Sequence, residues 1–230
     1  MSQAAAGRTG ALPSVFPGSW INADFYIWMG HRDDHRAWDQ VSAARALVAG
    51  WESPATAPLD FVVESGRILG LTGANGVGKT TVLSALAGRA RVFSGVLEAR
   101  PGLRLALQTQ DVPPVGGVPL SGRELLALTG ATMDGLPPWL AGRIDDRLDR
   151  LSGGQRHYLT LWAVLQAPAD LVLLDEPTNN LDSAGVDHLT SALRRLAGSG
   201  IGLVLVSHDH DFVDQVCDQV IVLQEAADVV

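Results

Sequence analysis

The chain has 230 residues, 47% of them hydrophobic, and a formal net charge of −8. This length and apolar content suffice for one large domain with a core, and the acidic balance argues against broad contact with a nucleic-acid backbone. Cys217 is the only cysteine, so the sequence offers neither a disulfide framework nor a cysteine-based zinc site. We expect a soluble, cytoplasmic protein, because no apolar run approaches the ~20 residues of a membrane span and the N-terminus has no apolar signal segment.

Short apolar runs broken by glycine and proline begin near Ala43 and alternate with amphipathic segments. All-apolar strands that alternate with helices are typical of a parallel sheet covered on both faces. The first strands have shorter connections and are expected to form a separate antiparallel layer. In chain order we predict strands at 46–49, 59–63, 68–71, 95–98, 103–108, 171–174, 201–206 and 220–223, and helices at 79–87, 155–166, 184–196 and between the last two strands, with short helical pieces within 111–150.

The segment 72–81, TGANGVGKTT, has the pattern G-x-x-x-x-G-K-[ST] between a predicted strand and a predicted helix. Its glycines allow backbone N–H groups to curl around an anion, and the helix N-terminus adds partial positive charge. Lys79, the only lysine of the chain, is expected to reach terminal phosphates, and the hydroxyl of Thr80 to bind Mg²⁺. Arginine carries a bulky planar head that fits a tight phosphate loop poorly, which explains why a lysine stands here.

Three later segments place polar groups where a ligand could bind. Residues 151–155, LSGGQ, open a predicted helix with Ser152 as its N-cap. Asp175 and Glu176 end one predicted strand and His208 follows another, at the sheet edge where ligands bind. Asp175 is suited to hold Mg²⁺ through water, and Glu176 to polarise an attacking water. Each segment alone is also compatible with a structural role, as a capped helix, a solvated acidic pair or a solvated loop histidine.

Taken together, these segments resemble the ATP-binding cassette (ABC) ATPases. The glycine-rich loop at 73–80, LSGGQ, LVLLDE at 171–176, NNLD at 179–182 and His208 match that family in order and approximate spacing. The resemblance covers about residues 43–225. It implies an α/β P-loop fold with a parallel core sheet, a small antiparallel β subdomain and a shortened helical subdomain at about 111–165. Residues 43–230 would form the cassette, and residues 1–42 an N-terminal extension of unclear role.

The resemblance also implies hydrolysis of Mg-ATP in a head-to-tail dimer. The catalytic residues would be Glu176 as general base, His208 at the γ-phosphate and Lys79. LSGGQ of one subunit would cover the ATP held by the phosphate loop of the other, and Asp182 would lie on a loop that crosses the interface. The implied ATP-binding residues are Trp51, Gly73, Asn75, Gly76, Gly78, Lys79, Thr80, Thr81, Gln108, Ser152, Gly153, Gly154, Gln155 and Asp182, and the implied Mg²⁺ ligands are Thr80, Asp175 and Gln108.

Two of these implied roles have alternatives. Trp51 stands where the family has an aromatic residue that stacks on adenine, and the alternative is a tryptophan of the core. Gln108 and Gln110 both come at the end of the strand predicted at 103–108. Gln108 is favoured, because the matching strand of the family usually ends directly in the glutamine.

Three functional classes fit the resemblance. Residues 102–108 and 119–126 are similar to cassettes of zinc and manganese importers, which favours an ATPase subunit at the inner face of the membrane, bound to a permease and driving metal-ion import. The segments DEPTNNLD and VSHDHDF are similar to ABC-F translation factors, which carry two cassettes and bind ribosomal RNA. A single cassette and an acidic charge favour the transporter, with no direct nucleic-acid contact. A non-catalytic ATP-gated clamp is disfavoured by the intact Glu176 and His208.

The first forty residues differ from the rest and are rich in tryptophan. Their run GSWINADFYIWMGH with a later AW is similar to a segment of family-57 α-glucan glycosidases, but no catalytic barrel accompanies it, so we assign no glycosidase activity. His31 and His35, with Asp33 and Asp34 between them, would share a helix face and could bind a metal. A solvated polar turn is the favoured interpretation.

Overall fold

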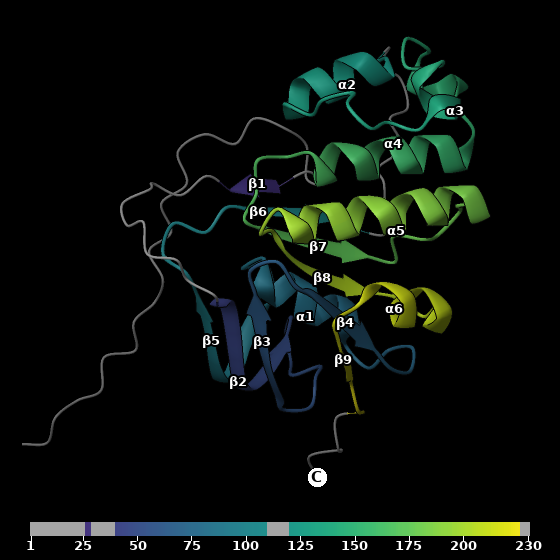
Figure 1. The fold of residues 1–230 in the computed structure, drawn as a ribbon. Coiled ribbons are helices and arrows are strands. Elements are labelled where there is room, and N and C mark those ends of the chain that lie inside the picture. The colour runs from purple at the N-terminus through teal and green to yellow at the C-terminus, as the bar shows by residue number, and fades with distance from the viewer. Residues whose placement is uncertain (1–25, 29–39, 110–119, 226–230) are drawn as a thin grey trace, which may run out of the picture.

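A computed structural model describes residues 26–28, 40–109 and 120–225 (Figure 1). His31, Asp33, Asp34, His35 and Gln110, named above as alternatives, lie outside these residues. A six-stranded sheet forms the centre, in the order β1-β6-β7-β8-β4-β9. Its strands are β1 (Tyr26–Trp28), β4 (Ile68–Thr72), β6 (Leu105–Gln108), β7 (Leu171–Asp175), β8 (Gly202–Val206) and β9 (Gln219–Val222).

The parallel core sheet predicted from the apolar runs is confirmed. Strands β6, β7, β8, β4 and β9 pair in parallel, and β1 adds an antiparallel edge strand beside β6. Every residue of β4, β7 and β8 is buried, as expected for strands covered on both faces. The strand β1 belongs to the segment assigned above to the N-terminal extension, so part of that segment joins the central sheet.

The two faces of the sheet carry separate apolar cores because side chains alternate along each strand. Along β7, Val172 and Leu174 pack under helices α4 (Gly153–Leu165), α5 (Ser183–Gly198) and α6 (His210–Val216). Leu171 and Leu173 face the opposite way, toward α1 (Lys79–Leu86) and a second sheet. In Figure 1 the sheet accordingly separates α1 from α4 and α5.

The second sheet is the predicted antiparallel layer, with strands β2 (Gln40–Gly50), β3 (Leu59–Glu64) and β5 (Arg91–Ala99) in the order β3-β2-β5. Both β2 and β5 are longer than the predicted 46–49 and 95–98, and β2 starts before the predicted domain boundary at 43. The local pattern is interrupted where Ala46 and Gly95 both have positive φ, of 47° and 78°. Pairing with neighbouring strands extends the sheet past this irregularity, which single-strand periodicity does not reveal.

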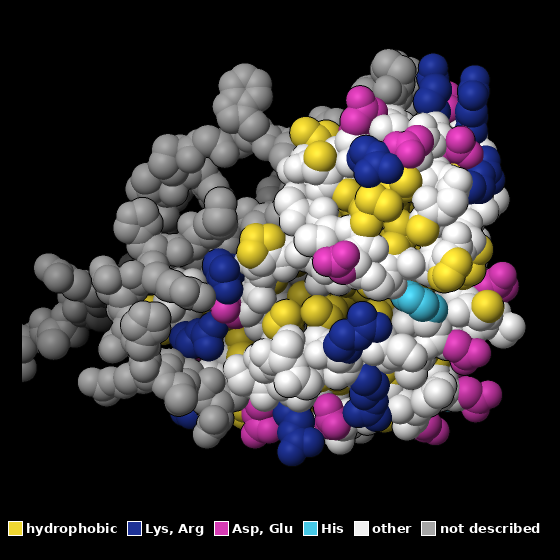
Figure 2. Space-filling model, turned by 45° about the horizontal axis from the view of Figure 1, so that its top comes forward, with side chains coloured by type: hydrophobic (Ala, Val, Ile, Leu, Met, Phe, Trp, Pro, Cys, Tyr) yellow, Lys and Arg dark blue, Asp and Glu magenta, His cyan; other side chains and the backbone are white. Residues whose placement is uncertain are grey.

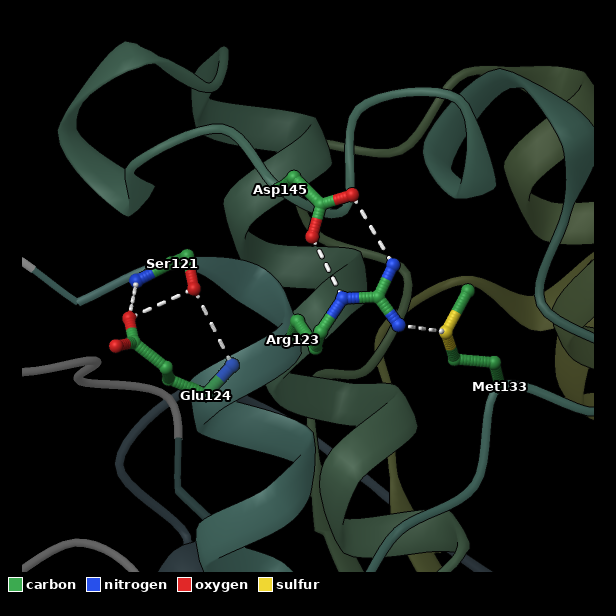
Figure 3. A network of polar contacts seen from close by, with 5 residues as sticks. All are labelled: Ser121, Arg123, Glu124, Met133 and Asp145. Carbon is green, nitrogen blue, oxygen red and sulfur yellow. Dashed lines mark hydrogen bonds and ion pairs between the residues drawn. The ribbon is translucent and has the colours of Figure 1, made fainter.

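The helical part occupies one end of the molecule and contains α2 (Gly122–Thr129), α3 (Pro138–Ala141), a 3₁₀ turn (Leu148–Arg150) and α4 (Figure 1). A polar network ties the start of α2 to the segments around it (Figure 3). Ser121 and Glu124 form a capping box at the N-terminus of α2. Arg123 donates two hydrogen bonds to Asp145 and one to the sulfur of Met133. None of the helices that the structure describes is long and apolar enough to cross a membrane.

Candidate nucleotide site

The phosphate loop between β4 and α1 has a backbone that only glycine adopts without strain. Gly73, Gly76 and Gly78 have φ values of 136°, 82° and 95°. A Cβ on Gly78 would also lie 2.7 Å from Thr56 Cγ2 and 2.9 Å from Ala55 O, too close for any side chain. Gly78 is the N-cap of α1, so the loop presents the positive end of that helix to its own concave side.

Lys79 is held in this loop by its own neighbours. Its Nζ donates hydrogen bonds to Gly73 O at 2.9 Å and to Ala74 O at 2.8 Å, and only 8% of the residue is exposed. The slim ammonium head thus lies among closely spaced carbonyl groups, where a planar guanidinium would need more room. A phosphate group in the loop would offer this cation stronger, charged acceptors.

A cavity of about 520 Å³ opens above the loop, within the usual size range of small-molecule sites. Its lining comes from α1 and the loop before it, from the end of β7 and from the end of β8. The lining residues are Asn75, Gly76, Gly78, Lys79, Thr80, Thr81, Asp175, Glu176, Val206 and His208. Nine of these ten were predicted as site residues; the exception is Val206, an apolar residue of β8 that carries no chemical signal in the sequence.

Glu176 and His208 meet at one edge of the cavity. The Oε2 atom of Glu176 accepts a hydrogen bond from the backbone N–H of His208 at 3.2 Å and lies 2.8 Å from His208 Nδ1. Glu176 has a φ of 50° and donates its own N–H to Val206 O at 2.9 Å, so its backbone is held in an unusual conformation beside β8. The side chain of Glu176 is 11% exposed and that of His208 66% exposed. The carboxylate is therefore placed by the protein, while the imidazole remains accessible to a ligand.

The oxygen donors for a magnesium ion are present in the same cavity. Thr80 offers a hydroxyl and Asp175, at the end of β7 and 2% exposed, offers a carboxylate. Hydroxyl and carboxylate oxygens, with phosphate oxygens and water, are the ligands that Mg²⁺ prefers. The donor set fits the ion. Gln108 lies behind this site: its Oε1 accepts from Asp175 N–H at 3.2 Å and its Nε2 donates to Thr109 O at 2.7 Å, and it does not line the cavity.

The LSGGQ segment lies away from the cavity of its own chain. Ser152 caps α4, as predicted. It also forms a capping box with Gln155, and α4 begins at Gly153, two residues before the predicted start at 155. Gln155 also accepts a hydrogen bond from Arg143 at 2.8 Å. Ser152 and Gly153 are exposed, and none of residues 151–155 lines the described cavity.

Asp182 and Trp51, two other predicted ligand-binding residues, also lie outside the lining. Asp182 caps α5 by accepting a hydrogen bond from Gly185 N–H at 2.8 Å, and it is exposed. Trp51 is 56% exposed, which excludes the alternative of a core tryptophan. It precedes Ala55 and Thr56, which lie so close to Gly78 that a Cβ there would be 2.9 Å from Ala55 O and 2.7 Å from Thr56 Cγ2.

A lysine in a glycine-rich loop, an Asp–Glu pair at a strand end and a histidine at the next strand end define a P-loop nucleoside-triphosphatase. Comparisons of this sequence with known proteins identify the family. A sequence profile described as "ABC transporter" matches residues 56–111. The zinc import ATP-binding protein ZnuC of Marinobacter nauticus is 32% identical over 191 residues, which span 80% of this chain and 74% of that protein.

Two further similarities extend this result. The uncharacterized ABC transporter ATP-binding protein YfmM of Bacillus subtilis is 31% identical over 180 residues, which span 72% of this chain and 33% of that protein. The solved structure of an ATP-binding subunit of an ABC transporter has the same fold, with a TM-score of 0.69 at 21% identity, covering 80% of this chain and 86% of that one. The chain belongs to the ABC transporter family and is an ABC-type ATPase.

Proposed function

We propose that the chain is the ATPase subunit of an ABC transporter, which hydrolyses Mg-ATP in a head-to-tail dimer and acts on a separate membrane permease. One observation carries the dimer. Among the described residues the cavity contains Lys79, Glu176 and His208 but nothing from LSGGQ. Because Ser152 and Gly153 are exposed at a helix N-terminus, a second copy can supply them to the open side of the nucleotide.

The residues of the cavity then have distinct roles. Lys79 and the loop N–H groups bind the phosphates. Thr80 and Asp175 would hold Mg²⁺, whose charge would offset that of the phosphates. Glu176 accepts the proton of an attacking water. His208, held at Glu176 Oε2, contacts the γ-phosphate and keeps the carboxylate oriented. Trp51 stacks on the adenine from the segment beside Gly78.

A permease partner and a metal-ion cargo are the finer parts of the proposal. Zinc import is the role printed for the ZnuC relative, at 32% identity. Figure 2 turns the helical end toward the viewer and shows apolar side chains gathered between charged ones on that face. The helical part of the chain exposes Leu128, Met133 and Trp139 by 59%, 38% and 37%. Exposed apolar side chains ringed by charge are suited to a protein partner.

The dimer is tested with Glu176→Gln, which keeps the shape of the side chain and removes the base. We expect this variant to form a stable dimer with Mg-ATP, measured by light scattering after gel filtration, while the wild type turns ATP over and returns to monomer. Lys79→Ala is the matched control and should stay monomeric, because it loses the phosphate contact. A monomeric Glu176→Gln protein at saturating ATP would contradict the proposed dimer.

An ABC-F-like role on ribosomes is the second candidate. It is favoured by the similarity to YfmM, because the matched residues span only 33% of that longer protein. The remaining two thirds of YfmM can contain further domains. Sedimentation of Glu176→Gln with ribosomes in ATP separates the two. Recovery with membranes that contain a permease supports the transporter, whereas stoichiometric recovery with ribosomes supports the alternative.

A further inference from the structure

His157 is a buried histidine that the proposed chemistry does not use. It lies on α4, two turns or less from Ser152, and is 7% exposed. Its Nε2 lies 3.2 Å from Pro177 O, and a carbonyl can only accept, so His157 donates this hydrogen bond. Pro177 directly follows Glu176 in the chain. The bond therefore joins the helix that begins with LSGGQ to the turn that carries the catalytic carboxylate.

A second contact joins the same two segments. A Cβ placed on Gly154 would lie 2.5 Å from Asn180 O, so the first turn of α4 packs directly on the backbone of the loop between β7 and α5. The start of α4 thus touches this loop at Pro177 and at Asn180. Two points of contact transmit a displacement of the helix better than one, because the loop cannot rotate freely about either.

The loop itself is held rigidly at both ends. Glu176 and Asn180 have positive φ values of 50° and 62°, and Asn179 N–H donates to Glu176 O at 3.2 Å. Asp182 anchors the far end by capping α5. These local restraints limit how far the backbone can bend between Glu176 and Asp182. A shift of α4 toward or away from Pro177 is therefore passed to the backbone of Glu176.

We propose that His157 is a positioning residue that couples the two ATP sites of the dimer. The hydrogen bond from Nε2 to Pro177 O fixes the position of the Glu176 carboxylate. That position then depends on whether LSGGQ of the same chain has bound the ATP held by the partner. This inference rests on the proposed dimer. In that dimer LSGGQ serves one ATP and Glu176 the other, so the His157–Pro177 bond is a direct mechanical link between them. Burial lowers the pKa of His157 and outweighs the hydrogen bond to the Pro177 carbonyl, which raises it, so the neutral ring is favoured. The hydrogen bond to Pro177 O places the proton of that ring on Nε2.

Three single substitutions in the full-length protein test the link. His157→Leu keeps an apolar side chain of similar bulk and removes the donor. His157→Gln returns an N–H near the position of Nε2. Tyr158→Phe is the matched control on the same helix: Tyr158 is fully buried, and its hydroxyl bonds to His188 on α5, away from the Glu176 turn.

We expect His157→Leu to lower kcat about 10- to 100-fold, the usual effect of misplacing a catalytic group by up to 1 Å, with KM for ATP changed less than about twofold. His157→Gln should restore kcat to within about threefold of wild type. Tyr158→Phe should lower Tm but leave kcat unchanged. A purely structural role of His157 is excluded by this pattern, because loss of stability alone is shared by the control.

The outcome also separates this inference from the dimer on which it rests. The double variant Glu176→Gln, His157→Leu should still dimerise with Mg-ATP, because LSGGQ itself is intact. If Glu176→Gln alone stays monomeric, the dimer is wrong and the coupling with it. If Glu176→Gln dimerises and His157→Leu has the kcat of Tyr158→Phe, or His157→Gln folds without restoring kcat, the coupling alone is overturned.

Discussion

Replacing Gly154 by alanine tests how closely the start of α4 packs on the loop that carries Glu176. The added Cβ would lie 2.5 Å from Asn180 O, about 1 Å short of the 3.4 Å at which ordinary contact begins. The obstacle is a backbone carbonyl, so no side chain can turn away to make room. Either the first turn of α4 or the loop must move by most of that distance.

The movement should lower both the stability of the protein and its kcat. Overpacking of a closely packed site costs about 1–3 kcal/mol. For a domain of this length each kcal/mol lowers Tm by roughly 2–4 °C. The displaced turn also moves Glu176, so kcat should fall about 10- to 100-fold. Differential scanning calorimetry and a phosphate-release assay on the same preparation measure the two effects.

Gly153→Ala is the matched control, one residue earlier in the same sequence motif. A Cβ there meets nothing within 4 Å, and alanine loses less conformational freedom than glycine when the chain folds. Its Tm should therefore equal or exceed that of the wild type. If Gly154→Ala keeps the wild-type Tm and turnover, the contact between α4 and Asn180 does not exist as described, and the argument for coupling through it is wrong.

Two further predictions concern the lysine and the buried histidines. Lys79→Arg should lose most ATP hydrolysis while the fold stays intact by circular dichroism, because the guanidinium does not fit between Gly73 O and Ala74 O. Near-normal turnover would contradict this reason for the lysine. Burial lowers the pKa of His157, and burial with the charge of Arg195 lowers that of His188, so the unfolded chain binds more protons than the folded one as pH falls below the ordinary value of 6.5. The urea concentration at the unfolding midpoint should therefore fall as the pH is lowered below about 6.5. The fall should be smaller in His157→Gln, which has one buried histidine fewer. A midpoint that stays level down to about pH 5 would refute this.

Much of the nucleotide site could be predicted because each of its parts is a short, continuous segment of the sequence. A phosphate loop needs its glycines, its lysine and its hydroxyl at a fixed spacing, so Gly78, Lys79 and Thr80 identify themselves. Asp175 and Glu176 end an apolar run, and parallel strands bring such ends to one edge. The parallel sheet was predicted from the alternation of apolar strands with helices, and the antiparallel layer from the short connections between the first strands. Both are present, so the predicted fold class is confirmed.

Only the tertiary structure decided which of these groups face one cavity and which face away. LSGGQ and Asp182 are as recognisable in the sequence as the phosphate loop, yet folding places both outside the cavity of their own chain. Gln108 ends its strand as predicted, but its side chain turns to the backbone of Asp175. The contact of His157 with Pro177 joins residues 20 apart, and no local pattern signals it. Sequence periodicity records which face of an element is apolar, whereas these distances depend on how the packed elements meet.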